Sequence, residues 1–145
     1  MKLLSGLFSA KKFVKKTIFQ QEMLAEACKC INLYLNNHYD DINVMYYASY
    51  LNFKIAERAI WGENRVGWTD GNGDIWLLDF IVNAADSFLV NVIAHELTHA
   101  KQYKRRFGVI RARGLGRWAA EKQALAMGAK VEKWCRDSIS SKLWQ

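Results

Sequence analysis

The chain has 145 residues, of which 51% are apolar and 13% aromatic, a composition that supports a packed core and excludes global disorder. No window reaches 18 uncharged apolar residues, so a membrane span is not expected. The 21 Lys and Arg residues outnumber the 14 Asp and Glu residues, which gives a formal charge of +7, and three cysteines do not form a disulfide framework.

The length predicts a single domain, residues 1–145. The positive charge of this domain is concentrated in two blocks. Residues 1–21, which include a basic N-terminal segment at 1–18, contain five lysines, residues 101–117 contain seven basic residues, and neither block contains an acid. Such blocks predict contact with something anionic, for example nucleic acid or a membrane surface, although a solvated basic face that keeps the protein soluble explains the same pattern. The basic residues of the second block are Lys101, Lys104, Arg105, Arg106, Arg111, Arg113 and Arg117.

The N-terminal sequence MKLLSGLFSAKKFVKK does not have the order of a secretory signal peptide. Its apolar run is short and interrupted, and four lysines follow it. Together with the odd number of cysteines, this predicts a cytoplasmic protein with reduced thiols. Cys28 and Cys30 are two residues apart in a helical stretch, so their side chains point about 200° apart, and we expect both to pack in the core.

The first half of the chain predicts a helix followed by strands. Apolar residues recur at three- and four-residue steps from about Thr17 to Asn36, which indicates an amphipathic helix. Residues 36–41 (NNHYDD) are rich in turn formers and indicate a loop. Residues 42–51 are rich in β-branched and aromatic residues and predict a strand, whereas residues 54–62 combine alternation with helix formers and favour a strand only weakly.

The second half of the chain predicts a β-hairpin and two helices. The turn DGNG (70–73) separates two alternating runs within residues 64–80, which is typical of a hairpin. The next helix is expected to start near residues 83–87 and to end at about 104–106. After a basic, glycine-containing connection, a last helix is expected over residues 117–137. This order of elements predicts an α+β fold.

The most informative pattern is HELTH, residues 95–99. His95 and His99 are four residues apart on the predicted helix, so they share one face with Cβ atoms roughly 5–6 Å apart, and two imidazoles at this separation can bind one zinc ion. Glu96 lies in the neighbouring sector, where a general base can take a proton from an attacking water. The alternatives are coincidence and two histidines satisfied by core hydrogen bonds. The apolar flanks argue against the second alternative, because burying two imidazoles and a carboxylate is costly unless an ion organises them.

A catalytic zinc site uses three protein ligands and leaves a fourth position for water, so a third ligand is needed. Glu121 is the best candidate, because it follows His99 by 22 residues in the first turn of the last helix, and a helix–loop–helix return can place it over the histidine pair. An acid that only favours the helix dipole is the alternative interpretation of this position. Other residues with ligand chemistry are His38 in the upstream loop and Glu132 and Cys135 late in the last helix.

These residues resemble a minimal zincin metallopeptidase of the gluzincin kind. VIAHELTHAKQY (92–103) resembles the HExxH helix of that group. WAAEKQALAMGAK (118–130) resembles its glutamate-bearing helix, in which small residues let the two helices approach closely. The resemblance covers residues 42–137 and implies a zincin-like core with one zinc ion on the two histidines and Glu121. The chain is also similar to SprT-like domains and to small phage-encoded metallopeptidases, which implies a phage origin.

The resemblance also implies where a substrate binds. GDIWLLDF, ahead of the HELTH helix, resembles the zincin edge strand that pairs with an extended peptide, so the strand at 74–80 is expected to bind the substrate. SprT-like domains take their third ligand from a later histidine, which this chain lacks, and this favours the glutamate arrangement and weakens the transfer of a DNA-linked role. Larger gluzincins supply a distant histidine or tyrosine that stabilises the oxyanion. The candidates for that task here are Tyr103, Arg113, Arg117 and the tyrosines of 46–50.

The expected function is a zinc-dependent peptidase in which Glu96 takes the water proton and passes it to the leaving amine. The alternative is a zincin-fold protein that binds nucleic acid through the basic 101–117 segment, or a DNA-associated protease that combines both activities. A role in lysing an anionic cell envelope is a third hypothesis, motivated by the positive charge.

Overall fold

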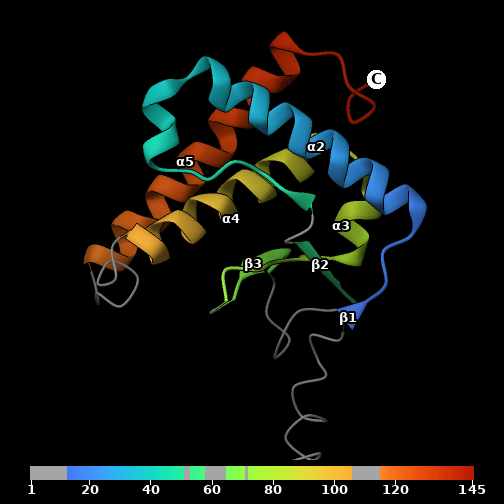
Figure 1. The fold of residues 1–145 in the computed structure, drawn as a ribbon, viewed down its shortest axis with the longest axis horizontal. Helices are drawn as coiled ribbons and strands as arrows, with labels where there is room; N and C mark the ends of the chain where they lie inside the picture. The colour runs from blue at the N-terminus through green and yellow to red at the C-terminus, as the bar shows by residue number, and fades with distance from the viewer. Residues whose placement is uncertain (1–12, 51–52, 58–64, 71, 106–114) are drawn as a thin grey trace, which may run out of the picture.

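A computed structural model describes residues 13–50, 53–57, 65–70, 72–105 and 115–145 (Figure 1). Within these residues the architecture is α+β, as the sequence predicts, with helices packed on a small mixed sheet. The elements in chain order are β1 (Phe13–Val14), α2 (Ile18–Asn37), the 3-10 helix η2 (Tyr39–Asn43), β2 (Phe53–Ala56), β3 (Gly67–Thr69), β4 (Ile75–Leu78), α3 (Asp79–Ala84), α4 (Phe88–Arg105) and α5 (Leu115–Ser138).

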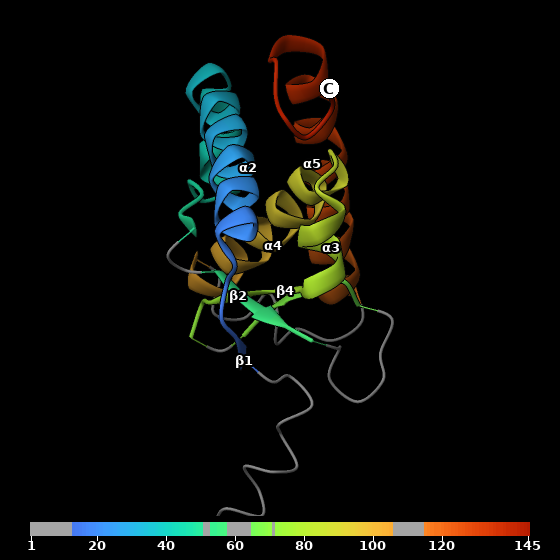
Figure 2. The same ribbon diagram turned by 90° about the vertical axis from the view of Figure 1, so that its right-hand side faces the viewer.

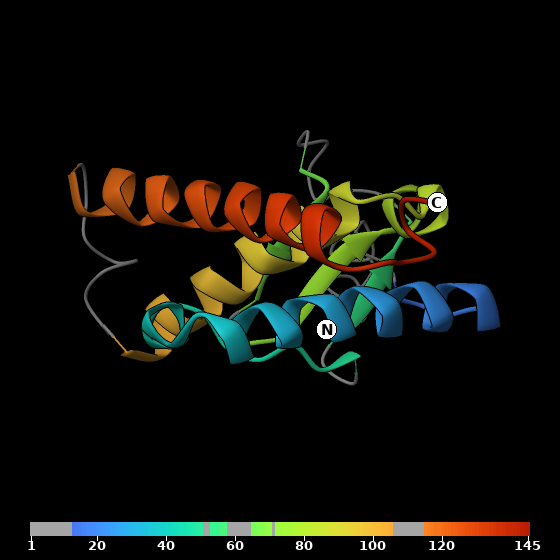
Figure 3. The ribbon, with the colours of Figure 1, turned by 90° about the horizontal axis from the view of Figure 1, so that it is seen from above.

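The three long helices lie on the same side of the sheet. α4 lies between α2 and α5 and packs directly on β3 and β4 (Figures 2 and 3). One cluster of buried apolar side chains joins the helices to the sheet, and Cys28 and Cys30 belong to it, as predicted. Among the described residues, no helix combines the length and the apolar character that a bilayer crossing requires. The largest fully buried members of the cluster are Leu24, Ile31, Tyr34, Leu35, Met45, Phe53, Ile55, Ile75, Leu77, Leu89 and Ile93.

The predicted helices are confirmed with small shifts at their ends. α2 begins after Thr17, whose hydroxyl accepts a hydrogen bond from the Gln20 amide while the Gln20 side chain accepts one from the Thr17 amide, each at 3.0 Å. This reciprocal capping box satisfies two backbone donors at the start of the helix. α5 begins two residues before its predicted start, and α4 begins at Phe88, directly after the range 83–87 in which its start was predicted.

The predicted hairpin is also confirmed. β3 and β4 pair antiparallel, with Trp68 opposite Trp76, and the two indole rings stack at 5.9 Å between centroids. In the connecting turn the Gly73 amide donates to the Asp70 carbonyl (3.1 Å), and Gly73 has a positive φ of 84°, which glycine adopts without strain. The Asp70 carboxylate holds the turn together by accepting hydrogen bonds from the Asn72 and Asp74 amides and from the Trp76 indole.

The strand expected over residues 42–51 is wrong for the described part of that segment. Tyr39–Asn43 form η2, and the chain from 44 to 50 is irregular. A side chain of α2 supplies the hydrogen bonds that a sheet would otherwise supply, because the Asn32 amide donates to the Ala48 carbonyl (3.1 Å) and accepts from the Ala48 amide (2.7 Å). The aromatic and β-branched residues of this segment are half-buried or exposed, and only Met45 and Ala48 are buried in the core.

Two other predictions lie partly outside the described residues. The weakly favoured strand over 54–62 corresponds to β2, which ends at Ala56, and residues 58–64 are not described. The basic segments are described only in part, since residues 1–12 and 106–114 fall outside the described ranges. The predicted loop at 36–41 contains the end of α2 and the start of η2.

The predicted edge strand is placed wrongly. The sheet order is β1-β2-β4-β3, so β4 lies between β2 and β3, pairing parallel with the first and antiparallel with the second. Both edges of β4 are occupied, and an extended substrate cannot add to the strand at 74–80. Among the described strands, β3 is the outer strand at this end of the sheet. The edge strand of the hairpin is therefore β3, its first arm, and not β4.

α4 and α5 pack closely along their length. A Cβ atom on Gly128 of α5 would lie 2.6 Å from Asn91 Oδ1 and 2.8 Å from the Asn91 carbonyl oxygen of α4. Ala120 and Ala124, on the same helix, are buried. The small residues of α5 therefore let the helices approach as the sequence predicts, and the approach is closest at Gly128.

We expect Gly128→Ala to destabilise the protein, although the same change in an exposed helix stabilises by about 1 kcal/mol. The added methyl group meets the α4 backbone, which cannot rotate away, so the cost is about 1–3 kcal/mol. Urea unfolding measures the change. As a control, Ala126→Gly at an exposed position of α5 should cost about 1 kcal/mol. A Gly128→Ala protein more stable than wild type would contradict the packing described for this contact.

Asp70 should contribute a pH-dependent part of the stability. Burial acts to raise its pKa, but hydrogen bonds from Trp76, Asn72 and Asp74 outweigh burial and lower the pKa below its usual range. The contribution is therefore complete above the unfolded pKa of about 3.9 and is lost as the pH falls through the folded value. We expect Asp70→Asn to destabilise by about 1–2 kcal/mol at pH 7, because the new amide group faces the Trp76 donor. The difference in the free energy of unfolding between wild type and Asp70→Asn should shrink as the pH is lowered. A difference that does not change with pH would contradict this expectation.

Candidate metal centre

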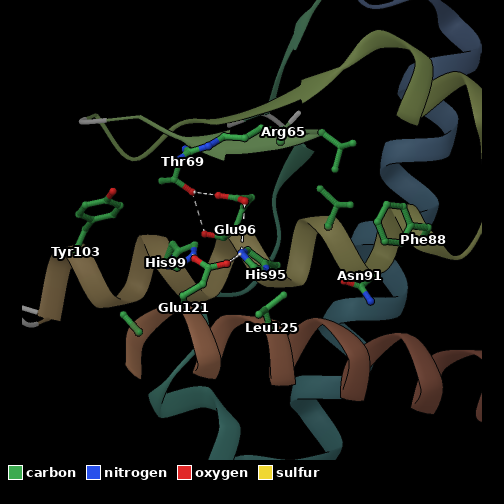
Figure 4. Close-up of a pocket in the computed structure, with 14 residues that line it drawn as sticks. Arg65, Thr69, Phe88, Asn91, His95, Glu96, His99, Tyr103, Glu121 and Leu125 are labelled. Carbon is green, nitrogen blue, oxygen red and sulfur yellow. Dashed lines mark hydrogen bonds and ion pairs between the residues drawn. The ribbon is translucent and has the colours of Figure 1, made fainter. Parts of the chain in front are cut away.

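The two histidines of HELTH lie on the side of α4 that faces α5. Their rings are 4.8 Å apart between centroids, at 72° to each other, and both side chains are about 15% exposed. Apolar neighbours on both flanks, such as Ile93 and Leu97, anchor this helix in the core. The pair is therefore held on a rigid element with its ring edges at the surface of a pocket (Figure 4).

Glu121 comes from the second turn of α5 and reaches both histidines. Its Oε1 lies 3.1 Å from His95 Nε2, and its Oε2 lies 2.9 Å from His99 Nε2. The ligand atoms of the three residues all lie within 4.8 Å of one another. Two donors that each lie about 2.1 Å from one tetrahedral zinc ion are about 3.4 Å apart, so this donor set fits a single ion with little movement. The structure thus brings together the three residues that the sequence predicted as ligands.

Gln102 fixes the orientation and tautomer of His99. Its Nε2 donates to the Ala120 carbonyl (3.0 Å) and to Gln123 Oε1 (2.8 Å), so its Oε1 must be the atom that lies 2.8 Å from His99 Nδ1. Nδ1 therefore carries a proton, and Nε2 is the ring atom turned toward Glu121. Nε2 lies 2.9 Å from a carboxylate oxygen of Glu121, a contact that a proton on Nε2 or a metal ion between the two atoms satisfies.

Glu96 is turned away from Glu121 toward the sheet (Figure 4). It is only 7% exposed, its Oε1 accepts a hydrogen bond from the Thr69 hydroxyl (2.9 Å), and its Oε2 lies 3.9 Å from His95 Nε2. Burial raises the pKa of the Glu96 carboxyl, and the Thr69 hydrogen bond partly opposes this shift. A buried carboxylate beside the ligands, with a raised pKa, suits a group that accepts a proton near neutral pH.

The His95 ring is held in the form that binds metals. Burial lowers the pKa of the His95 imidazole, and the neighbouring His99 lowers it further, while Glu121 opposes the shift. A lowered pKa favours the neutral ring, which has a lone pair to offer an ion. The electrostatics of the site therefore agree with its geometry.

The centre lies in a pocket of about 500 Å³ between α4, α5 and β3. Phe88, Asn91 and Leu125 line one end of the pocket, Tyr103 lines the other, and Arg65 lies on the sheet side near Thr69 (Figure 4). The side chains of Phe88, Tyr103 and Leu125 are 44%, 47% and 57% exposed, which leaves apolar surface open beside the ligands. This volume is sufficient for a few residues of a peptide.

Three functional candidates were missed in the sequence. Gln102 follows His99 by three residues, a spacing that could have indicated a partner for its ring. Thr69 and Arg65 precede the motif by about 30 residues and carry no local signal. The charge of Arg65 acts on the Glu96 carboxyl and lowers its pKa, although less than burial raises it.

The other residues with ligand chemistry lie elsewhere. The His38 ring stacks on Tyr34 at 4.0 Å between centroids and hydrogen-bonds the Tyr34 carbonyl. The Cys135 thiol donates to the Cys30 carbonyl in the core. Glu132 accepts hydrogen bonds from Ser87 and Asn91. None of these three alternatives belongs to the cluster around His95.

Of the predicted contacts to the transition state, Tyr103 lines the pocket. Arg113 lies outside the described residues, and Arg117 is described only as part of the α5 backbone. Of the tyrosines within 46–50, none lines this pocket. Lys101 places its ammonium group 4.5 Å from the Tyr46 ring centroid. The remaining basic candidates have no described side chains, and they are Lys104, Arg105, Arg106 and Arg111.

Comparisons of this chain with protein-family models, with curated proteins and with solved structures returned no match. The resemblance to gluzincins therefore rests on the HELTH residues of α4 and the Glu121-bearing face of α5. Any proposal about function depends on the geometry around these residues.

We expect the protein to bind one zinc ion and to gain thermal stability from it, because an ion that binds only the folded state shifts the unfolding equilibrium. His99→Ala and Glu121→Ala each remove a donor and should weaken binding by more than about 100-fold. Gln102→Ala removes only the partner of the His99 ring and should cost about 10–100-fold. Chelator competition measures these affinities.

The matched control for zinc binding is His38→Ala, which removes a histidine outside the cluster and should leave the affinity unchanged. Equal zinc affinity in the Glu121→Ala protein would remove α5 from the ligand set.

Proposed function

We propose that this protein is a zinc-dependent peptidase of the gluzincin kind. The observation that carries the proposal is the meeting of His95, His99 and Glu121 from two helices at one point, with the buried carboxylate of Glu96 beside them. Three ligands leave a tetrahedral ion one open position, which is typical of catalytic sites, whereas structural zinc sites are usually closed by four protein ligands.

The residues of the site have separate tasks in this proposal. A zinc ion bound by the three ligands would lower the pKa of a bound water and polarise the scissile carbonyl. Glu96 takes the proton from the attacking water and passes it to the leaving amine. Thr69 holds Oε1 of Glu96, while Oε2 lies on the side of His95, 3.9 Å from Nε2. Gln102 keeps the lone pair of His99 directed at the ion.

We infer that a peptide substrate lies along β3. β3 is the outer strand of the described sheet at this end, and Val66, Gly67 and Thr69 line the same pocket as the ligands. An extended peptide that adds to this strand would present its backbone to the ion, with side chains alternating toward and away from the pocket. This replaces the strand at 74–80 as the expected binding edge.

Two described side chains that line the pocket are candidates to stabilise the negative charge that would develop on the substrate. Tyr103 follows His99 by one helical turn, and Arg65 lies across the pocket near Glu96. Either a phenol or a guanidinium can donate to a developing oxyanion. Arg113 and Arg117 stay predictions for the same task.

The alternative of nucleic-acid binding has no described observation in its favour. It depends on the two basic blocks, and most of the side chains in those blocks are not described. It stays a prediction, as do the cytoplasmic location and the phage origin. Affinity for nucleic acid that falls steeply as salt concentration rises would support it.

We expect Glu96→Gln to lower peptide cleavage by about 10²–10⁴-fold, because an amide cannot accept the proton of water. Zinc affinity should be nearly unchanged, since Glu96 is not a ligand. A pool of quenched fluorescent peptides, with and without chelator, measures the activity. Glu22→Gln on the exposed face of α2 is the matched control and should cleave as wild type does. Equal cleavage by the Glu96→Gln and wild-type proteins would rule out the proposed mechanism.

A further inference from the structure

A second polar cluster joins α4 and α5 away from the ligands. Glu132 of α5 accepts hydrogen bonds from the Ser87 hydroxyl at Oε2 (2.7 Å) and from the Asn91 amide at Oε1 (2.9 Å). Ser87 directly precedes α4, so the carboxylate lies at the positive end of that helix, where a negative charge is favourable. The chemistry proposed above does not use the Glu132 carboxylate.

Glu132 and Glu121 lie on the same face of α5. They are 11 residues apart, which is about three turns, so the two side chains point within about 20° of each other and lie about 16 Å apart along the helix. On α4, Asn91 and His95 are likewise neighbours on one face, one turn apart. The two helices run antiparallel (Figure 1). They face each other through these stripes, with Glu121 opposite His95 and Glu132 opposite Asn91.

The packing between these two contacts allows little freedom. Gly128 lies between them on α5 and touches Asn91 so closely that an added Cβ would be 2.6 Å from its side chain. Asn91 is therefore held from two sides, by the glycine surface and by the Glu132 carboxylate. A shift of α5 by one residue would break both contacts, and it would also turn Glu121 by about 100° away from the histidines.

We propose that Glu132 is a positioning residue that fixes the register of α5 on α4 and so places the third metal ligand. The inference rests on the metal site of the proposed function. Gln102 anchors the near end of α5 through Ala120 and Gln123, while Glu132 anchors the far end through Ser87 and Asn91. Glu121 is held between the two anchors, and its own side chain is 53% exposed. The hydrogen bonds of Glu132 hold α5 in register on α4, which the exposed carboxylate of Glu121 cannot do by itself.

The test compares metal affinity with stability in matched variants. Glu132→Gln keeps the shape of the side chain, but its amide nitrogen cannot accept, so one of the two hydrogen bonds is lost. Val131→Ala, at the fully buried neighbouring position, removes core packing and leaves the carboxylate in place. We expect both variants to melt at a lower temperature. Only Glu132→Gln should bind zinc about 10–100-fold more weakly in chelator competition.

A second readout follows the ligand set directly. With cobalt in place of zinc, the visible absorption of the ion reports its coordination. The Glu132→Gln spectrum should move toward that of Glu121→Ala, whereas the Val131→Ala spectrum should match wild type. If Glu132→Gln fails to fold, Ser87→Ala and Asn91→Ala test the same cluster from the other helix. In the Asn91→Ala background, Glu132→Gln should have a smaller effect than in wild type, because the two residues act through one contact.

The outcomes separate this inference from the proposed function. Wild-type zinc affinity and cobalt spectrum in Glu132→Gln would overturn the inference and leave the peptidase proposal standing. Zinc binding that depends on Glu132, in a protein that cleaves no peptide, would support the inference and remove the peptidase. Equal losses of affinity in Glu132→Gln and Val131→Ala would assign Glu132 a purely structural role and also overturn it.

Discussion

His99 Nε2 and a carboxylate oxygen of Glu121 face each other at 2.9 Å, and the packing of α4 on α5 arranges this contact. Gln102 accepts the Nδ1 proton of His99 and so holds the ring with Nε2 toward the carboxylate, where a proton or a metal ion can bridge the two atoms. The contact joins residues 22 positions apart across two helices. The site therefore depends on how α4 and α5 pack, and the packing depends on small residues where the two backbones come closest.

The same dependence explains which parts could be predicted from sequence. Helices α2, α4 and α5 show their apolar period within short windows, and α2 also shows its capping box, so their positions followed from local patterns. His95 and His99 share one helix face for the same local reason. Glu121 could be named because its chemistry and its distance along the chain suited a returning helix, but only the packed structure measures its reach.

The parts that sequence could not predict all involve partners distant in the chain. The parallel pairing of β2 with β4 moves β4 to the interior of the sheet, and nothing within 74–80 encodes that neighbour. Within residues 42–50 only Met45 and Ala48 are buried, and Asn32 of α2 satisfies the backbone at Ala48, so this aromatic segment packs without forming a strand. Thr69 is a further case, because only the packing of β3 on α4 brings its hydroxyl group to Glu96.

This packing connects the sheet edge to the chemistry. Gly67 allows β3 to lie directly on α4, since a Cβ there would be 2.9 Å from a Val92 methyl carbon, and two residues later Thr69 reaches the Glu96 carboxylate. A peptide that adds to the outer edge of β3 would bind to the same three-residue strand that orients the general base. The Thr69 hydroxyl lies 2.9 Å from the Glu96 carboxylate and 3.1 Å from the Glu96 backbone carbonyl, so any movement of that strand on binding would be transmitted to Glu96 through this hydroxyl. Alignment of the substrate and orientation of the base are therefore not independent in this fold, and a strand so short can couple them because α4 holds it against the core.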